Sequence, residues 1–140
     1  MARFLDSSAY LHAYLKPKRK LTKEEMEIKR RSIEILRRID EGEKVLTTVI
    51  HIAEIINIIE SKQGLNKALH LLETLLALEN MKIIGINRED YEYALSIADK
   101  LKISPNDALA ALSCRKYGIK EVYSFDKHYD NIPWIKRVID

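Results

Sequence analysis

The sequence predicts an α/β protein in which helices cover both faces of a parallel sheet. Short apolar stretches alternate with longer amphipathic ones, and this strand–helix repetition is typical of parallel sheets. Hydrophobic residues make up 46% of the chain and charged residues 32%, with only four glycines and three prolines, which indicates a helix-rich globular protein. The length of 140 residues suits one domain, so we expect a single domain over residues 1–140.

Local signals set the boundaries of the expected elements. Thr22 is placed to cap a helix, because Glu25 three residues later completes a capping box. Ser104 is placed to cap another, with Pro105 in its first turn and Gly118 beyond its end. Strands are expected where apolar and β-branched residues cluster. In chain order we expect strand 2–6, helix 7–15, helix 22–41, strand 44–48, helix 48–62, helix 65–79, strand 81–86, helix 88–101, helix 104–117, strand 120–125 and a short strand 135–139.

The composition excludes several classes of protein. No apolar run approaches the roughly 20 residues that cross a bilayer, so we expect no membrane contact. The start of the chain does not read as a signal peptide, because Asp6 interrupts its apolar stretch. Cys114 is the only cysteine, which excludes an intramolecular disulfide and a multi-cysteine zinc site, and we interpret it as a small buried hydrophobe. These features together favour a cytoplasmic protein.

Positive charge is concentrated in one segment of the chain. The formal net charge is +3, but residues 16–31 hold eight basic and three acidic residues. Such a segment could contact phosphate groups, or it could be a solvated helix face with Glu/Lys pairs. Both interpretations stay open. A stripe of Tyr10, Leu11, Tyr14 and Leu15 could likewise serve an interface, but we favour a place in the core.

Four acidic residues follow strands or begin the helices that come after them. Asp6 ends the first strand, Asp126 follows the strand at 120–125, Asp107 lies in a first helical turn, and Glu54 lies in the second turn of the helix after 44–48. In parallel sheets, functional groups gather beyond the carboxyl ends of the strands. We therefore expect these four carboxylates on one edge of the sheet.

Each of these acids also has a simpler interpretation. Asp6 could cap the helix that follows it, Asp107 could pair with the Ser104 cap, and Asp126 could be a turn former. Glu54 could be solvated, although its helix is apolar nearly all round. In that helix Glu54 shares one polar stripe with three other residues, namely His51, Asn57 and Ser61.

The acids taken together point to a metal. Clustered carboxylates raise one another's pKa unless a cation neutralises them. An all-oxygen site suits a hard divalent ion such as Mg²⁺ or Mn²⁺. Such ions activate water and stabilise the charge that develops on a phosphodiester.

Four segments carry a resemblance to a known family: "FLDSSAYL", "TTVIHIAEI", "ISPNDALAAL" and "VYSFDKHYD". In order and spacing the chain resembles the PIN domain, and within it the small ribonucleases similar to VapC toxins. The resemblance implies a three-layer α/β/α fold with a parallel five-stranded sheet and a metal-dependent endonuclease that usually acts on RNA. It also implies that Mg²⁺ or Mn²⁺, as one or two ions, is held by an acidic quartet, namely Asp6, Glu54, Asp107 and Asp126.

The resemblance assigns supporting residues as well. Ser124 matches a small hydroxyl residue that orients ligands or water, and Ser8 matches a polar position after the first acid. Many relatives carry a further acid two residues beyond the last one. Here that position is His128, which we interpret as a surface residue, with Asp130 as a candidate substitute.

The resulting hypothesis is metal-dependent hydrolysis of RNA. Lys127 and some of the lysines at 16–20 are expected to hold the RNA backbone. The family also implies a homodimer and a small antitoxin that blocks the acidic edge, with an arginine entering the metal site. The alternative is a non-enzymatic PIN-like module that binds RNA or protein and keeps a structural metal site. A receiver-like domain fits poorly, because no acidic pair follows the first strand.

Overall fold

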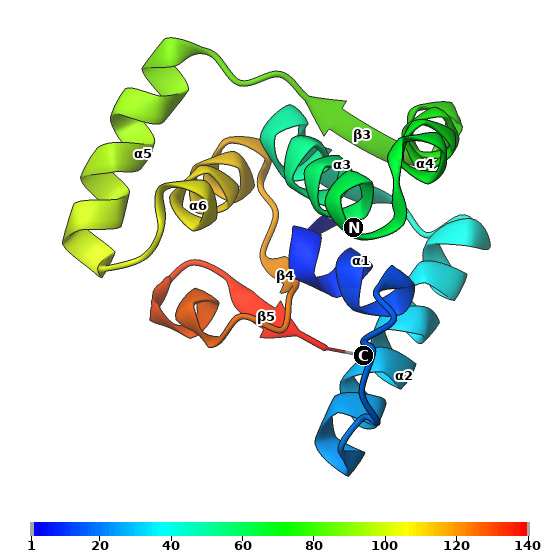
Figure 1. The fold of residues 1–140 in the computed structure, drawn as a ribbon. Helices are drawn as coiled ribbons and strands as arrows, with labels where there is room; N and C mark the ends of the chain where they lie inside the picture. The colour runs from blue at the N-terminus through cyan, green and yellow to red at the C-terminus, as the bar shows by residue number, and fades with distance from the viewer. Residues whose placement is uncertain (1, 140) are drawn as a thin grey trace.

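The computed structural model describes residues 2–139 and confirms the three-layer α/β/α fold with a parallel five-stranded sheet. The strand order is β3-β2-β1-β4-β5, and every neighbouring pair is parallel. Figure 1 shows this sheet between two groups of helices. The strands are β1 (Arg3–Leu5), β2 (Val45–Thr48), β3 (Met81–Ile84), β4 (Glu121–Tyr123) and β5 (Lys136–Val138).

Six α-helices lie within two residues of the expected boundaries: α1 (Ser7–Tyr14), α2 (Lys23–Asp40), α3 (Val49–Gln63), α4 (Leu65–Ala77), α5 (Arg88–Leu101) and α6 (Pro105–Tyr117). The expected Thr22–Glu25 capping box is present, and the Ser104 hydroxyl accepts a hydrogen bond from the Asp107 amide. A short 3₁₀ helix, η1 (Lys127–Asn131), follows β4 and was not expected. Within residues 2–139, no helix combines the length and the apolar character that crossing a membrane requires.

Two hydrophobic clusters fill the space on either side of the sheet. Successive strand residues point to opposite faces, so Phe4 packs into one cluster and Leu5 into the other. The first cluster joins the sheet to α5 and α6, and the second joins it to α1, α2, α3 and α4. Cys114 is fully buried in the first, as expected. Tyr10 and Leu11 are buried in the second, with Tyr14 and Leu15 packed against it, which confirms that this stripe belongs to the core.

The order of the strands reverses at β1. The chain passes from β1 to β2 on one side and later returns to β4 on the other side of β1. In doubly wound sheets, ligands bind outside the carboxyl ends of the strands at such a reversal of strand order. Asp6 directly follows β1, and Ser124 directly follows β4. The fold therefore places these two residues at this reversal of the strand order.

Asn80 stabilises the turn before β2. Its side-chain amide donates hydrogen bonds to the carbonyl oxygens of Ile39 (2.7 Å) and Glu43 (2.6 Å), so it ties the end of α2 to the start of β3. We expect Asn80→Ala to lower the free energy of unfolding by roughly 1–3 kcal/mol, because two carbonyl groups lose their donor. Urea unfolding would measure this change. Asn66→Ala, at an exposed position of α4, is the control, and an equal loss in both variants would contradict the assignment.

Candidate active site

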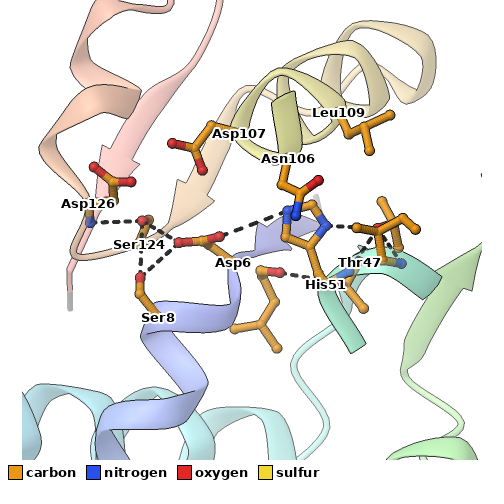
Figure 2. A network of polar contacts seen from close by, with 12 residues as sticks. Asp6, Ser8, Thr47, His51, Asn106, Asp107, Leu109, Ser124 and Asp126 are labelled. Carbon is orange, nitrogen blue, oxygen red and sulfur yellow. Dashed lines mark hydrogen bonds and ion pairs between the residues drawn. The ribbon is translucent and has the colours of Figure 1, made fainter. Parts of the chain in front are cut away.

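Asp6 is the best-connected residue of the acidic edge. Its Oδ2 accepts hydrogen bonds from the hydroxyls of Ser8 (2.8 Å) and Ser124 (2.7 Å), and its Oδ1 accepts one from Tyr129 (3.1 Å). Figure 2 shows Asp6 between the two serines. Asp6 occupies the position before α1 but makes no side-chain cap hydrogen bond, so its interpretation as a helix cap is wrong. The carboxylate instead joins the end of β1 to the segment after β4.

The two serines link Asp6 to the segment that carries Asp126. The Ser124 hydroxyl accepts a hydrogen bond from the Asp126 amide (3.0 Å), and the Ser8 hydroxyl accepts one from the Phe125 amide (3.1 Å). Each hydroxyl therefore uses its hydrogen for Asp6 and its lone pairs for the backbone. This arrangement fixes where the chain after β4 passes the first carboxylate.

Asp107, Asp126 and His128 form a compact group. One ligand atom from each residue lies within 4.8 Å of the others. Asp126 caps η1, because its Oδ1 accepts a hydrogen bond from the His128 amide (2.9 Å), which confirms that it is also a turn former. Asp107 comes from the first turn of α6, and in Figure 2 its carboxylate and that of Asp126 point into the same space. His128 is exposed, as expected, but it is also part of this group.

Burial and mutual repulsion raise the pKa of two of the acids. The pKa of Asp107 rises from 3.8 to about 7, first because the carboxyl is buried and then because of the nearby charges of Asp6 and Asp126. The pKa of Glu54 is also raised, mainly by burial, although Asn106 and Ser7 donate hydrogen bonds that oppose the rise. Glu54 is half-buried and near Asp6, but it lies outside the compact group.

His51 lies beneath Asp6 and is fully buried. Its Nδ1 is 2.7 Å from the Thr48 hydroxyl, which already accepts hydrogen bonds from the amides of Ile50 and His51. Because both lone pairs of that hydroxyl are engaged, it donates its hydrogen to Nδ1, and the neutral ring carries its own proton on Nε2. Burial lowers the pKa of His51, which keeps the ring neutral.

The Nε2 atom of His51 has no hydrogen-bond partner among the described residues. It lies 3.9 Å from Oδ1 of Asp6, a contact drawn in Figure 2. The carbonyl of Asn106 is near enough to favour a charged ring, but it does not form a regular hydrogen bond with Nε2. An unpaired buried donor is costly, so this atom marks a polar position directed at the acidic edge.

The remaining predicted residues lie around this centre. Asp130 is exposed, and both of its oxygens pair with Arg137 of β5 (3.1 and 3.3 Å), so it is not part of the compact group. Lys127 is exposed in the first position of η1. Sequence reasoning gave no role to Tyr129, His51 or Arg137. The sequence does contain one signal for Tyr129, because it is an aromatic residue within the otherwise polar turn after Asp126.

The donor set fits a divalent cation. Asp107 and Asp126 face one space at the edge of the sheet, and burial together with the nearby charge of Asp6 raises the pKa of Asp107 and of Glu54. The arginine that lies nearest after β4, Arg137, is engaged with Asp130. Hard cations prefer such oxygen ligands.

The fold and the acidic edge define a doubly wound α/β domain with a carboxylate site at its topological switch point. The sequence matches the PIN domain over residues 4–135. The chain therefore belongs to the PIN domain family. No curated protein gives a significant match.

Solved structures share the fold over nearly the whole chain. VapC20 of Mycobacterium tuberculosis, described as a sarcin-ricin loop cleaving toxin, aligns with a TM-score of 0.72 and 17% identity, covering 96% of this chain and 97% of its own. In VapBC2 of Rickettsia felis, bound to a promoter DNA fragment, a chain aligns with a TM-score of 0.66 and 14% identity over 99% and 98%. FitAcB of Neisseria gonorrhoeae aligns with a TM-score of 0.62 and 16% identity, covering 96% of this chain and 94% of its own. At these identities the likeness shows the fold.

The raised pKa of Asp107 predicts a pH-dependent loss of stability without metal. The folded protein holds this proton more tightly than the unfolded chain does. The stabilisation is therefore present at pH below 3.8 and disappears as the pH rises through about 7. Between pH 5.5 and 7 we expect wild type to lose at most about 1.5 kcal/mol relative to Asp107→Asn, because the slope of about 1.4 kcal/mol per pH unit falls as the carboxyl ionises near its pKa. Urea unfolding in EDTA measures both proteins, and parallel pH profiles would refute the expectation.

The contact between Thr48 and His51 predicts one tautomer. Long-range ¹H–¹⁵N correlation spectra should show His51 with a protonated Nε2 and an unprotonated Nδ1 at pH 7. Thr48→Val should remove this preference and lower the free energy of unfolding by about 1 kcal/mol, because the cap of α3 is lost as well. Thr48→Ser keeps the hydroxyl and should preserve the tautomer. A protonated Nδ1 in wild type would disprove this account.

Proposed function

We propose that this PIN domain, spanning residues 1–140, is a divalent-metal-dependent endoribonuclease of the VapC type. The observation that carries the proposal is the convergence of Asp107 and Asp126 beside the buried Asp6, at the carboxyl edge of the sheet. Carboxylates that raise one another's pKa need a cation when they ionise together. Metal-assisted phosphodiester hydrolysis is a chemistry that requires such a site.

Asp6, Glu54, Asp107 and Asp126 would hold Mg²⁺ or Mn²⁺. The bound ion would supply an activated water and stabilise the charge that develops on phosphorus. Ser8, Ser124 and Tyr129 fix the orientation of Asp6 through their hydroxyls. His51 fills the space beneath Asp6 and excludes water from that side. These residues keep the first carboxylate in one position before any ligand arrives.

A groove lined by lysines supports binding of an RNA backbone. It has a volume of about 710 Å³ and is lined by five lysines: Lys16, Lys18, Lys29, Lys62 and Lys67. Its one acidic residue, Glu25, is paired with Arg19. His12 lines the groove and contacts the ring of Phe125, which precedes Asp126, with 5.4 Å between ring centroids. This ring contact links one lining residue of the groove to the segment that carries Asp126, and the lysines along the groove would meet phosphates.

The basic segment 16–31 divides between its two interpretations. Glu27 pairs with Arg30 and Arg31 on the surface of α2, which agrees with a solvated helix face. Lys16 and Lys18 instead line the groove. We assign RNA contact to the groove lysines other than Lys29, which donates to carbonyl oxygens at the end of α1, and, from η1, to Lys127.

The proposal also covers the partners of this protein and its location in the cell. The structures similar to this chain include toxin–antitoxin complexes from Rickettsia felis and Klebsiella pneumoniae. A toxin of this kind would act on RNA in the cytoplasm. It would be held inactive by a small antitoxin, whose arginine enters the acidic site, and would form a homodimer.

The alternative function is a binding module that keeps the metal for structure alone. Three hydroxyl donors fix the orientation of the Asp6 carboxylate. A module that only binds RNA or protein does not need a carboxylate held in one orientation, so these hydrogen bonds favour catalysis. A nuclease assay beside a Mn²⁺ titration separates the two. Mn²⁺ binding without any cleavage of RNA would support the module.

Loss of a carboxylate should abolish cleavage. We expect Asp6→Asn and Asp126→Asn to reduce cleavage of a structured RNA panel at least about 100-fold with Mg²⁺ or Mn²⁺, because an amide ligand weakens metal binding. EDTA should have the same effect on wild type. Asp99→Asn, at an exposed acid of α5, is the control and should keep full activity. Equal cleavage in EDTA would refute the proposal.

A further inference from the structure

The compact group at the acidic edge contains one nitrogen ligand. Asp107 and Asp126 offer carboxylate oxygens, and His128 offers an imidazole nitrogen, within 4.8 Å of one another. The His128 side chain is exposed, so it can reorient without disturbing the core. No other described histidine or cysteine belongs to the group. The donor set is therefore mixed rather than composed of oxygen alone.

The spacing of this group resembles a coordination shell. Nδ1 of His128 lies 3.2 Å from Oδ1 of Asp126. Two adjacent ligands of an octahedral ion are about 3.0 Å apart when each bond is about 2.1 Å, and opposite ligands are about 4.2 Å apart. The imidazole and the carboxylate thus already lie at the separation of adjacent ligands. An oxygen of Asp107 lies within 4.8 Å of ligand atoms of both residues, so it is available as a third ligand.

The backbone of η1 produces this spacing. Asp126 caps η1 by accepting a hydrogen bond from the His128 amide, which turns the chain so that residues 126 and 128 face the same side. A second observation marks the neighbouring position. The buried Nε2 of His51 has no hydrogen-bond partner among the described residues and lies 3.9 Å from Oδ1 of Asp6. A buried N–H donor without a partner beside Asp6 needs an acceptor, which the oxygen of a water bound to an ion at this edge would supply.

We propose that His128 is a metal ligand and that it makes the site select a first-row transition ion, such as Mn²⁺, over Mg²⁺. This inference rests on the proposed function only for the presence of a divalent ion. Mg²⁺ favours oxygen ligands and retains its waters, whereas imidazole binds transition ions well and adds affinity along the series from Mn²⁺ to Cu²⁺. An imidazole ligand in this group therefore changes which ion the site prefers.

The rival explanation is a local ion pair between His128 and Asp126, with no ion involved. The two explanations predict different ligand atoms around a bound Mn²⁺ ion. An ion bound by His128 has a ¹⁴N nucleus in its coordination shell, whereas an ion bound by carboxylates alone has none. Electron spin-echo envelope modulation of bound Mn²⁺ detects such a nucleus directly and does not depend on RNA cleavage.

The experiment uses the full chain without a histidine tag at pH 8, where imidazole is neutral. Wild type should show ¹⁴N modulation, and His128→Asp should abolish it. In calorimetric titrations, the ratio of the Mg²⁺ and Mn²⁺ dissociation constants should fall at least about tenfold in His128→Asp, since lost metal-site partners usually cost that much. His70→Ala, at an exposed histidine of α4, should leave both signals unchanged.

Wild type without ¹⁴N modulation, or an unchanged dissociation-constant ratio in a folded His128→Asp protein, would overturn the assignment of His128. RNA cleavage is recorded separately for the same proteins. If ¹⁴N modulation is present but no RNA is cut, the ribonuclease proposal fails and His128 remains a ligand. If wild type cuts RNA and His128→Asp keeps the ratio, only the inference about His128 fails.

Discussion

The buried carboxylate of Asp6 is the constraint on which the acidic edge depends. A charged group in this position is costly unless hydrogen bonds compensate for the lost water. The chain supplies them from Ser124 and Tyr129, which lie 118 and 123 residues further along, and from Ser8 in the next helix. Satisfying one carboxylate therefore joins β1, α1, β4 and η1 into a single unit. The site and the central strands of the sheet are stabilised by the same contacts.

This arrangement has an electrostatic consequence for the other acids. Asp6 is held by neutral donors, so no positive charge is present to offset its own. Asp107 experiences that charge together with burial, which explains why its pKa rises to about 7. Arg137 comes nearest after β4, but its guanidinium pairs with Asp130 instead. The carboxylates at this edge therefore repel one another, and this repulsion favours binding of a cation.

The sequence predicted the position of the acids because strand periodicity and parallel pairing determine which residues reach one edge. Asp6 and Asp126 follow strands, and Asp107 follows a recognisable Ser104 cap, so local signals were sufficient. The contacts made by Tyr129 and His51 could not be predicted in this way. They depend on how close η1 and α3 approach Asp6, and that distance is decided by packing rather than by any nearby residue.

Asp126 illustrates why the sequence alone could not assign one role to a single acidic residue. As a turn former it caps η1, and as a candidate ligand it faces Asp107. These roles do not compete, because one oxygen can accept the His128 amide while the carboxylate still borders the site. The cap fixes η1, and η1 places the imidazole 3.2 Å from the capping oxygen. A turn signal in the sequence is therefore the means by which the chain builds this pair of ligand atoms. The cap of η1 therefore explains why the exposed His128 belongs to the same group as the buried Asp107.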